Sequence, residues 1–340
     1  MLSSSSRCEL GNSAMDRRTV ILTIGSSLLA TFASHAQTPA KVWRIGFLAG
    51  GARPPDGGPP AALRQALQAL GYVIDKNVTY TGRWAEGKSE RMPALAAELV
   101  GLDVDLVLTV GAPAAEAARK ATSTIPIVIV SAGDAVGTGL IKSLARPGGN
   151  VTGITEPATE LSAKRLGLLK EALPGATRIA VLWNASDEAM TLRYREIERA
   201  ARVLRVTVQP LGVREPDDID EALSTMTRDR PDAFFMVSDA LTSLNRKRIL
   251  GFAATHRIPA MYEFGGLVRD GGLMSYGPTL DDMFGRSAIY IDKIFKGAKP
   301  GELSIEQPTR YYLLVNLKTA KELGLTIAEP VLLRADEVIQ

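Results

Sequence analysis

Cysteine and histidine are almost absent from this 340-residue sequence, which holds one cysteine and two histidines. Cys8 and His35 fall in an N-terminal stretch that we interpret below as a removable signal. The remaining chain has no thiol and one imidazole, His256, at the predicted end of a helix. This inventory excludes disulfides, thiol chemistry and a Cys/His zinc site. A Ser-His-Asp triad is disfavoured because no Gly-x-Ser-x-Gly elbow occurs. We therefore expect no catalytic residue, no metal and no cofactor.

A large excess of charge of one sign is also missing. The net charge is +3, and no basic run is longer than Arg246-Lys247-Arg248, with pairs such as Arg17-Arg18 elsewhere. A nucleic-acid-binding protein usually carries a stripe of positive charge, so we expect no nucleic-acid partner. Hydrophobic residues make up 46% of the chain and charged residues 23%, which is ordinary for a globular protein.

Long hydrophobic runs are missing except near the N-terminus, where Arg17-Arg18 precede the uncharged run 20–30. That run is short for a bilayer span, and it leads to the small-x-small sequence Ser34-His35-Ala36. This pattern is typical of a secretory signal peptide, so we predict a signal over residues 1–36, cleavage after Ala36 and a periplasmic product. Met15 is the better start, which makes residues 1–14 a start-site artefact. The twin arginine leaves the Sec and twin-arginine export routes both open.

Apolar runs rich in Val and Ile alternate with amphipathic segments after residue 42, as expected of parallel strands joined by helices. The predicted strands of the first series are 43–49, 78–82, 105–110, 126–130 and 151–155, and its helices are 61–70, 91–100 and 113–121. The second series has strands 178–183, 207–213, 232–237 and 259–262 and helices 160–173, 188–204, 217–228 and 242–256. A helix at 280–295 and a strand at 310–315 follow. Two such series predict two doubly wound α/β lobes with parallel sheets, over about 42–155 and 156–275.

Two phosphate-binding patterns occur, and neither has the right context. The segment 82–89 fits G-x-x-x-x-G-K-[ST], but Glu86 lies where the anions would sit. The next strand ends in Gly111, where a nucleotide site needs an Asp for magnesium. Gly137-Thr138-Gly139 lacks the last glycine of a dinucleotide fingerprint. We therefore expect this chain to bind neither ATP nor the dinucleotide NAD.

Small and polar residues follow the predicted strands, where helices start and where ligands bind in open α/β sheets. Free N–H groups there favour a ligand carboxylate. Asp134, Asp239 and Glu263 offer partners for an ammonium ion, and Trp84, Tyr262 and Phe264 offer aromatic surface. Capping and turn formation explain the same residue types equally well. The candidates are Gly50, Gly51, Trp84, Gly111, Ala112, Ser131, Asp134, Asn184, Ser186, Asp187, Ser238, Asp239, Tyr262 and Glu263.

A longer run links these strand ends to a known family. Gly133-Asp134-Ala135-Val136-Gly137-Thr138-Gly139-Leu140, followed by Ser143-Leu144-Ala145-Arg146-Pro147-Gly148-Gly149-Asn150, resembles the signature of ABC-transporter substrate-binding proteins of the tryptophan-transporter-like group. Further similar stretches are 83–87, 275–277, 296–300, 315–325 and 334–338. The resemblance implies a type I periplasmic-binding-protein fold with three crossover segments. It assigns about 278–300 to the first lobe and 301–340 to the second, and it adds Tyr276 to the candidate ligand contacts.

These observations predict a periplasmic binding protein that holds a small amino-acid-like or aromatic anionic solute between its lobes and delivers it to an inner-membrane ABC permease. A monomer is the expected state for a protein that closes about a hinge. Two alternatives stay open at this point. One is a periplasmic sensor that feeds a membrane receptor, and the other is an α/β enzyme in the same compartment.

Overall fold

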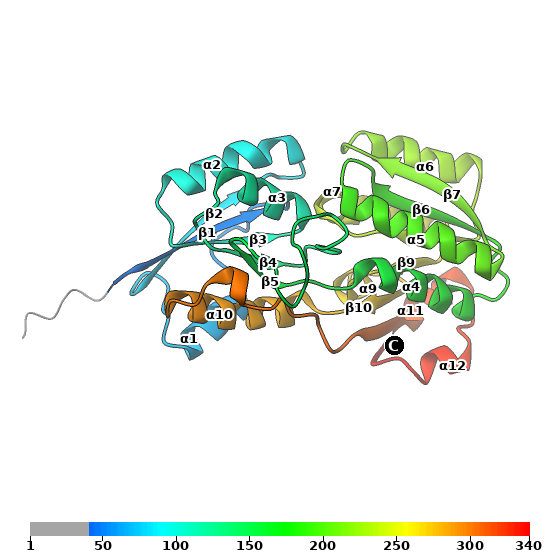
Figure 1. Ribbon diagram of the computed structural model, residues 1–340. Coiled ribbons are helices and arrows are strands. Elements are labelled where there is room, and N and C mark those ends of the chain that lie inside the picture. Colours follow the sequence, from blue (N-terminus) through cyan, green and yellow to red (C-terminus); the bar gives the residue numbers. More distant parts are fainter. Residues whose placement is uncertain (1–40) are drawn as a thin grey trace, which may run out of the picture. The chain divides into compact units, whose positions relative to one another are not determined.

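A computed structural model describes residues 41–340, which contain two β-sheets flanked by helices (Figure 1). The predicted signal peptide and Cys8 lie outside the described residues. Within 41–340, no helix has the length and apolar character needed to cross a membrane.

The first sheet has five parallel strands in the order β2-β1-β3-β4-β5. The strands are β1 (Trp43–Ala49), β2 (Val78–Trp84), β3 (Leu106–Val110), β4 (Ile127–Val130) and β5 (Val151–Ile154). Strand β4 is buried on both faces, which explains its uninterrupted run of Ile and Val. Helices α2 (Met92–Gly101) and α3 (Ala112–Ala121) cover one face. Helices α1 (Ala61–Ala69) and α10 (Leu280–Phe295) lie side by side on the other (Figure 1).

The second sheet has seven strands in the order β12-β11-β10-β9-β8-β6-β7. They are β6 (Arg178–Asn184), β7 (Thr207–Val213), β8 (Ala233–Met236), β9 (Ala260–Tyr262), β10 (Met274–Gly277), β11 (Tyr312–Asn316) and β12 (Glu337–Ile339). One face carries α4 (Ala158–Ala172), α5 (Glu188–Leu204), α11 (Leu317–Leu323) and α12 (Glu329–Leu332). The other carries α6 (Asp218–Arg228), α7 (Ala240–Leu244), α8 (Arg246–Thr255) and α9 (Gly265–Arg269). Short 3₁₀ turns at Ser89–Arg91 and Pro300–Glu302 complete the elements.

The chain passes between the sheets three times: after β5, between β10 and α10, and before β11. The predicted fold class, two α/β lobes built on parallel sheets, is confirmed. The lobe boundaries remain a prediction. We place the last crossing after Glu306, because Ile305 is buried in the core of the first lobe and Glu306 bridges to Ile154.

Strands β10 and β12 and helices α9, α11 and α12 have no counterpart among the predicted elements, and two further details differ. The predicted helix 242–256 is divided at Asn245 into α7 and α8. The second sheet is not wholly parallel, because β10 pairs with β11 in the antiparallel direction. The strand β11 reaches this position only after the chain has packed α10 on the first sheet, which the local pattern of residues 310–315 does not encode.

Candidate functional site

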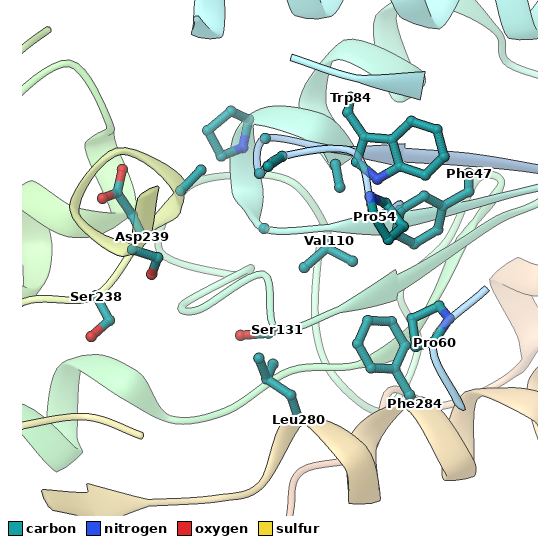
Figure 2. A pocket seen from close by; sticks show the side chains of 18 of the residues that line it. Phe47, Pro54, Pro60, Trp84, Val110, Ser131, Ser238, Asp239, Leu280 and Phe284 are labelled. Atoms are coloured by element: carbon teal, nitrogen blue, oxygen red, sulfur yellow. The ribbon is translucent and has the colours of Figure 1, made fainter. Parts of the chain in front are cut away.

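A cavity of about 850 Å³ lies at the carboxyl ends of the strands and is lined by residues of both lobes. Figure 2 shows the aromatic side chains of the first lobe on one side of it, and Ser238 and Asp239 of the second lobe on the other. This is the position where open α/β sheets bind ligands. Its place between elements distant in sequence makes it the strongest candidate site in residues 41–340.

Phe264, predicted to offer aromatic surface, lines this cavity, and so do nine of the fifteen candidate contacts: Gly50, Gly51, Trp84, Gly111, Ala112, Ser131, Asp187, Ser238 and Asp239. Each lies at the end of a strand or at the start of the helix that follows. Asp187 caps α5 by accepting a hydrogen bond from Ala189 N, 2.8 Å away. Asp239 and Thr242 form a capping box at the start of α7. Capping and lining are therefore compatible roles for these two acids.

The structure does not bring the other six predicted residues to the cavity. Tyr262 is 1% exposed and packs in the core of the second lobe. Ser186 faces solvent, and Asp134 accepts a hydrogen bond from Gly137 N within its own turn. Tyr276 packs against Tyr311, with Lys164 over its ring.

The remaining two of those six, Asn184 and Glu263, lie behind the second-lobe residues that line the cavity. The amide of Asn184 donates to Asp239 Oδ2 at 2.7 Å and so fixes that carboxylate. Glu263 is fully buried and is held by two arginines, which leaves it unavailable to a ligand ammonium. The acid predicted from its place after β9 is thus part of the support of the site.

An aromatic hollow, defined by Phe47, Trp84, Phe284, Pro54 and Pro60, forms the part of the cavity in the first lobe (Figure 2). The rings of Phe47 and Trp84 lie 5.9 Å apart. Sequence reasoning named only Trp84 of this group. The shared face of β1 and β2 was a usable signal for Phe47, whereas Phe284 comes from a helix about 200 residues away in the chain.

Four buried charged side chains belong to the second-lobe wall and its support: Arg193 lines the cavity, and Arg165, Glu156 and Glu263 lie behind it. Glu263 accepts from Arg165 Nη1 at 2.8 Å and from Arg193 Nη1 at 2.7 Å. Arg193 Nη2 also reaches Glu156 Oε1 at 3.2 Å, and Ser131 Oγ donates to the same oxygen at 3.1 Å. Glu156 therefore connects the end of β4 in the first lobe to α5 in the second.

Asp187 is the most perturbed acid of the wall. Burial, and then the negative charge of Asp239, raise the pKa of its carboxyl group to about 6, against the opposing effect of Arg193. A carboxylate in this state is stabilised by any positive charge that enters the cavity.

Three glycines of the first lobe lie where the second lobe approaches most closely. A Cβ at Gly50 would lie 2.6 Å from Ala240 Cβ, and one at Gly87 would lie 2.9 Å from Leu244 Cδ1. A Cβ at Gly133 would lie 2.8 Å from Arg193 Nη2. These positions have no room for a side chain in this arrangement of the lobes.

The loop that resembles a phosphate-binding loop uses its backbone for another purpose. The N–H groups of Ala85, Glu86 and Gly87 donate to the carbonyls of Ala49, Gly51 and Gly50. Donors engaged in this way cannot wrap a phosphate, which agrees with the rejection made from sequence. Among residues 41–340, no group of three or more His, Cys, Asp or Glu side chains is arranged to hold a metal ion.

Comparison with known proteins gives the family. The profile of the ABC transporter substrate binding protein family matches residues 61–339. The chain belongs to this family. The resemblance inferred from the 133–150 run is thereby confirmed.

Relatives of this substrate-binding protein include a tyrosine-binding protein of Clostridioides difficile, 24% identical over 261 residues, which are 77% of this chain and 75% of the relative. A conserved domain protein from Vibrio cholerae has a similar solved structure, with a TM-score of 0.80, 26% identity and coverage of 88% of this chain and 100% of that one. An ABC domain from Streptococcus pneumoniae, solved in complex with L-Trp, has a TM-score of 0.78 and 26% identity, covering 87% of this chain and 99% of that one. These likenesses support the type I periplasmic-binding-protein fold.

Proposed function

We propose that this substrate-binding protein serves an ABC importer, and that its cavity binds a small amino-acid-like or aromatic solute. The observation that carries the proposal is the combination in one cavity of an aromatic hollow on one lobe and polar groups on the other. Relatives that bind tyrosine and L-Trp support the same solute class. The residues proposed to contact the solute are the nine predicted residues that line the cavity.

The aromatic hollow suits a planar apolar ring. Phe47, Trp84 and Phe284 present ring surfaces, and Pro54 and Pro60 close the sides. Burying an aromatic side chain there removes its apolar area from water, and favourable ring pairs add about 0.5–1.5 kcal/mol each.

The start of α3 suits a carboxylate. Gly111, with a φ of 84°, precedes α3, and Gly111, Ala112 and Pro113 at the start of this helix line the cavity. The first N–H groups of a helix have no intrahelical acceptor and lie at the positive end of its dipole. Ala112 and Ser131 of the first lobe line the cavity beside the first turn of α3.

Delivery to a permease, rather than chemistry, is the proposed role. Export with removal of residues 1–36 places the protein in the periplasm, and N-terminal sequencing of the exported product should begin at Gln37. We propose no catalytic step. His256, the sole imidazole after the signal, stacks on Phe252 at the end of α8, with 4.2 Å between ring centroids.

Binding and transport test this function separately. Titration calorimetry of the purified protein against aromatic amino acids should give saturable binding, and uptake of the bound solute should fall in cells that lack the gene. Trp84→Ala should weaken binding about tenfold, because it removes a ring from the hollow. Trp43→Ala is the matched control, since Trp43 stacks on Phe295 outside the cavity. Equal losses in both variants, or no binding of any such solute, would contradict the proposal.

A further inference from the structure

Neither acid on the second-lobe side of the cavity, Asp187 or Asp239, has an ion-pair partner among residues 41–340, and Asp187 is the more deeply buried of the two. Asp187 lines the cavity and is 7% exposed, yet it forms no ion pair with any residue between 41 and 340. Its Oδ1 accepts from Ala189 N, which holds the carboxylate in place at the start of α5. A buried carboxylate without a counter-charge costs folding free energy.

The other acids near the strand ends are already engaged. Asp239 Oδ1 accepts from Thr242 N at 2.9 Å, and its Oδ2 accepts from the Asn184 amide. Glu263 is enclosed by two guanidinium groups and also accepts from Ser238 N at 3.1 Å. Asp134 does not line the cavity. Asp187 is therefore the acid left for a ligand.

The positive charge of Arg193 lowers the pKa of Asp187, but this arginine forms its ion pairs with other carboxylates. Arg193 lines the same cavity, but its Nη1 and Nη2 bind Glu263 and Glu156. Arg165 is buried behind Glu263. The wall and its support contain four carboxylates and two guanidinium groups, which leaves an excess of negative charge facing the cavity.

We infer that Asp187 determines specificity by binding a positively charged ammonium group of the solute, so that the cavity takes amino acids in preference to aromatic acids that lack an amine. This inference rests on the proposed function, since it concerns the same cavity. The ring occupies the aromatic hollow of the first lobe, and the ammonium group meets Asp187 on the second. A solute bound in this way contacts both lobes.

Matched pairs of solutes test the inference. The purified protein is titrated with L-tryptophan and indole-3-propionate, and with L-tyrosine and 3-(4-hydroxyphenyl)propionate, which differ by the amine. Charge-assisted hydrogen bonds predict that each amino acid binds about 10–100-fold more tightly than its partner. Asp187→Asn should weaken amino-acid binding by a similar factor and leave the acids unchanged, because Asn keeps the helix cap but not the charge.

Asp134→Asn is the control, because it changes an acid beside a strand end that lies outside the cavity. Thermal unfolding of each variant shows that it is folded. Equal affinity for both members of a pair in the wild type would overturn the inference and leave the proposed function standing. An amine preference that survives Asp187→Asn would also overturn it. If no aromatic solute binds, the proposed function itself fails.

Discussion

Asp187 should make solute binding depend on pH. Burial and then the charge of Asp239 raise the pKa of Asp187 to about 6, against the opposing charge of Arg193. An ammonium group pairs with the ionised carboxylate, so affinity for an amino acid should be full above pH 7 and fall as the pH drops through 6. The fall approaches tenfold per pH unit well below the pKa. Titrations at pH 7.5, 6.5 and 5.5 measure it, and Asp187→Asn should remove this dependence. A wild-type affinity that is flat over this range would count against a titrating Asp187 at the site.

The same residue should affect stability in the opposite direction. A carboxyl pKa that is higher in the folded state than its ordinary value of 3.8 favours the protonated form, so stability falls as pH rises from about 4 to 6. The shift corresponds to a loss of roughly 3 kcal/mol above pH 6. Without solute, Asp187→Asn should therefore unfold at a higher temperature than the wild type at pH 7. A lower midpoint for the variant would contradict this account. The trade of stability for binding is common at functional sites.

Single residues also show where sequence reasoning stops. Asp187 and Glu263 both follow strands and look alike in the sequence. Their roles differ because Arg165 and Arg193, which lie on α4 and α5, turn toward Glu263. The difference between the two acids depends on packing between helices that are distant in the sequence, so the local sequence pattern does not predict it.

At the scale of elements, apolar runs and helical periodicity were sufficient for most of the fold. Strands β1 and β7 have the predicted limits, since their ends coincide with clear changes of pattern. Strand β10 was not predicted, because the short run Met274–Gly277 contains a serine and a glycine and has no apolar alternation. The division of the helix at Asn245 was also missed, because Asn245 caps a turn that the apolar period continues across.

The loop after β1 lies close to the start of α7, and this contact can be tested by substitution. Gly50 has a backbone conformation that alanine adopts, but its Cβ would lie 2.6 Å from Ala240. Gly50→Ala should hold the two lobes apart and weaken solute binding about tenfold, since overpacking costs about 1–3 kcal/mol. Calorimetry measures the affinity, and thermal unfolding of the free protein should change little if the lobes separate.

Gly51→Ala is the matched control for that variant. Gly51 also lines the cavity, and a Cβ added there meets no atom within 4 Å. It therefore adds the same methyl group to the cavity lining without blocking the approach of the lobes, so its loss of affinity measures the effect on the solute contact alone and should be smaller than that of Gly50→Ala. If the two variants lose affinity equally, the effect belongs to the cavity lining, and the steric argument for Gly50 is wrong.

At the scale of residues 41–340 as a whole, the sequence predicts where the site lies but not the full set of residues that line it. Strand ends such as Gly111 and Ser238 were found because parallel strands place their carboxyl ends at one edge. The hollow was missed because Phe284 enters it from α10, a helix that returns to the first lobe after β10 and before the last strands of the second lobe. Which residues line the cavity thus depends on the three passages of the chain between the lobes.

Those crossings and the buried contacts between lobes predict that the lobes unfold together. Glu156 Oε1 accepts from Ser131 of one lobe and Arg193 of the other, and Ala112 packs against the core of the second lobe. Losing either lobe leaves buried charges without partners in the other, at a cost of several kcal/mol.

The three tryptophans report on the lobes separately. Trp183→Phe leaves Trp43 and Trp84 in the first lobe, whereas the double variant Trp43→Phe/Trp84→Phe leaves Trp183 in β6. Urea unfolding followed by fluorescence should give the same midpoint for both reporters, after correction for the stability of each variant measured by circular dichroism. For a solute that still binds each variant, a concentration 100 times its Kd should stabilise both lobes by about 2.7 kcal/mol, because it binds the native state alone. Separate midpoints, or a solute-induced shift confined to one lobe, would show that the solute and the buried contacts do not couple the lobes.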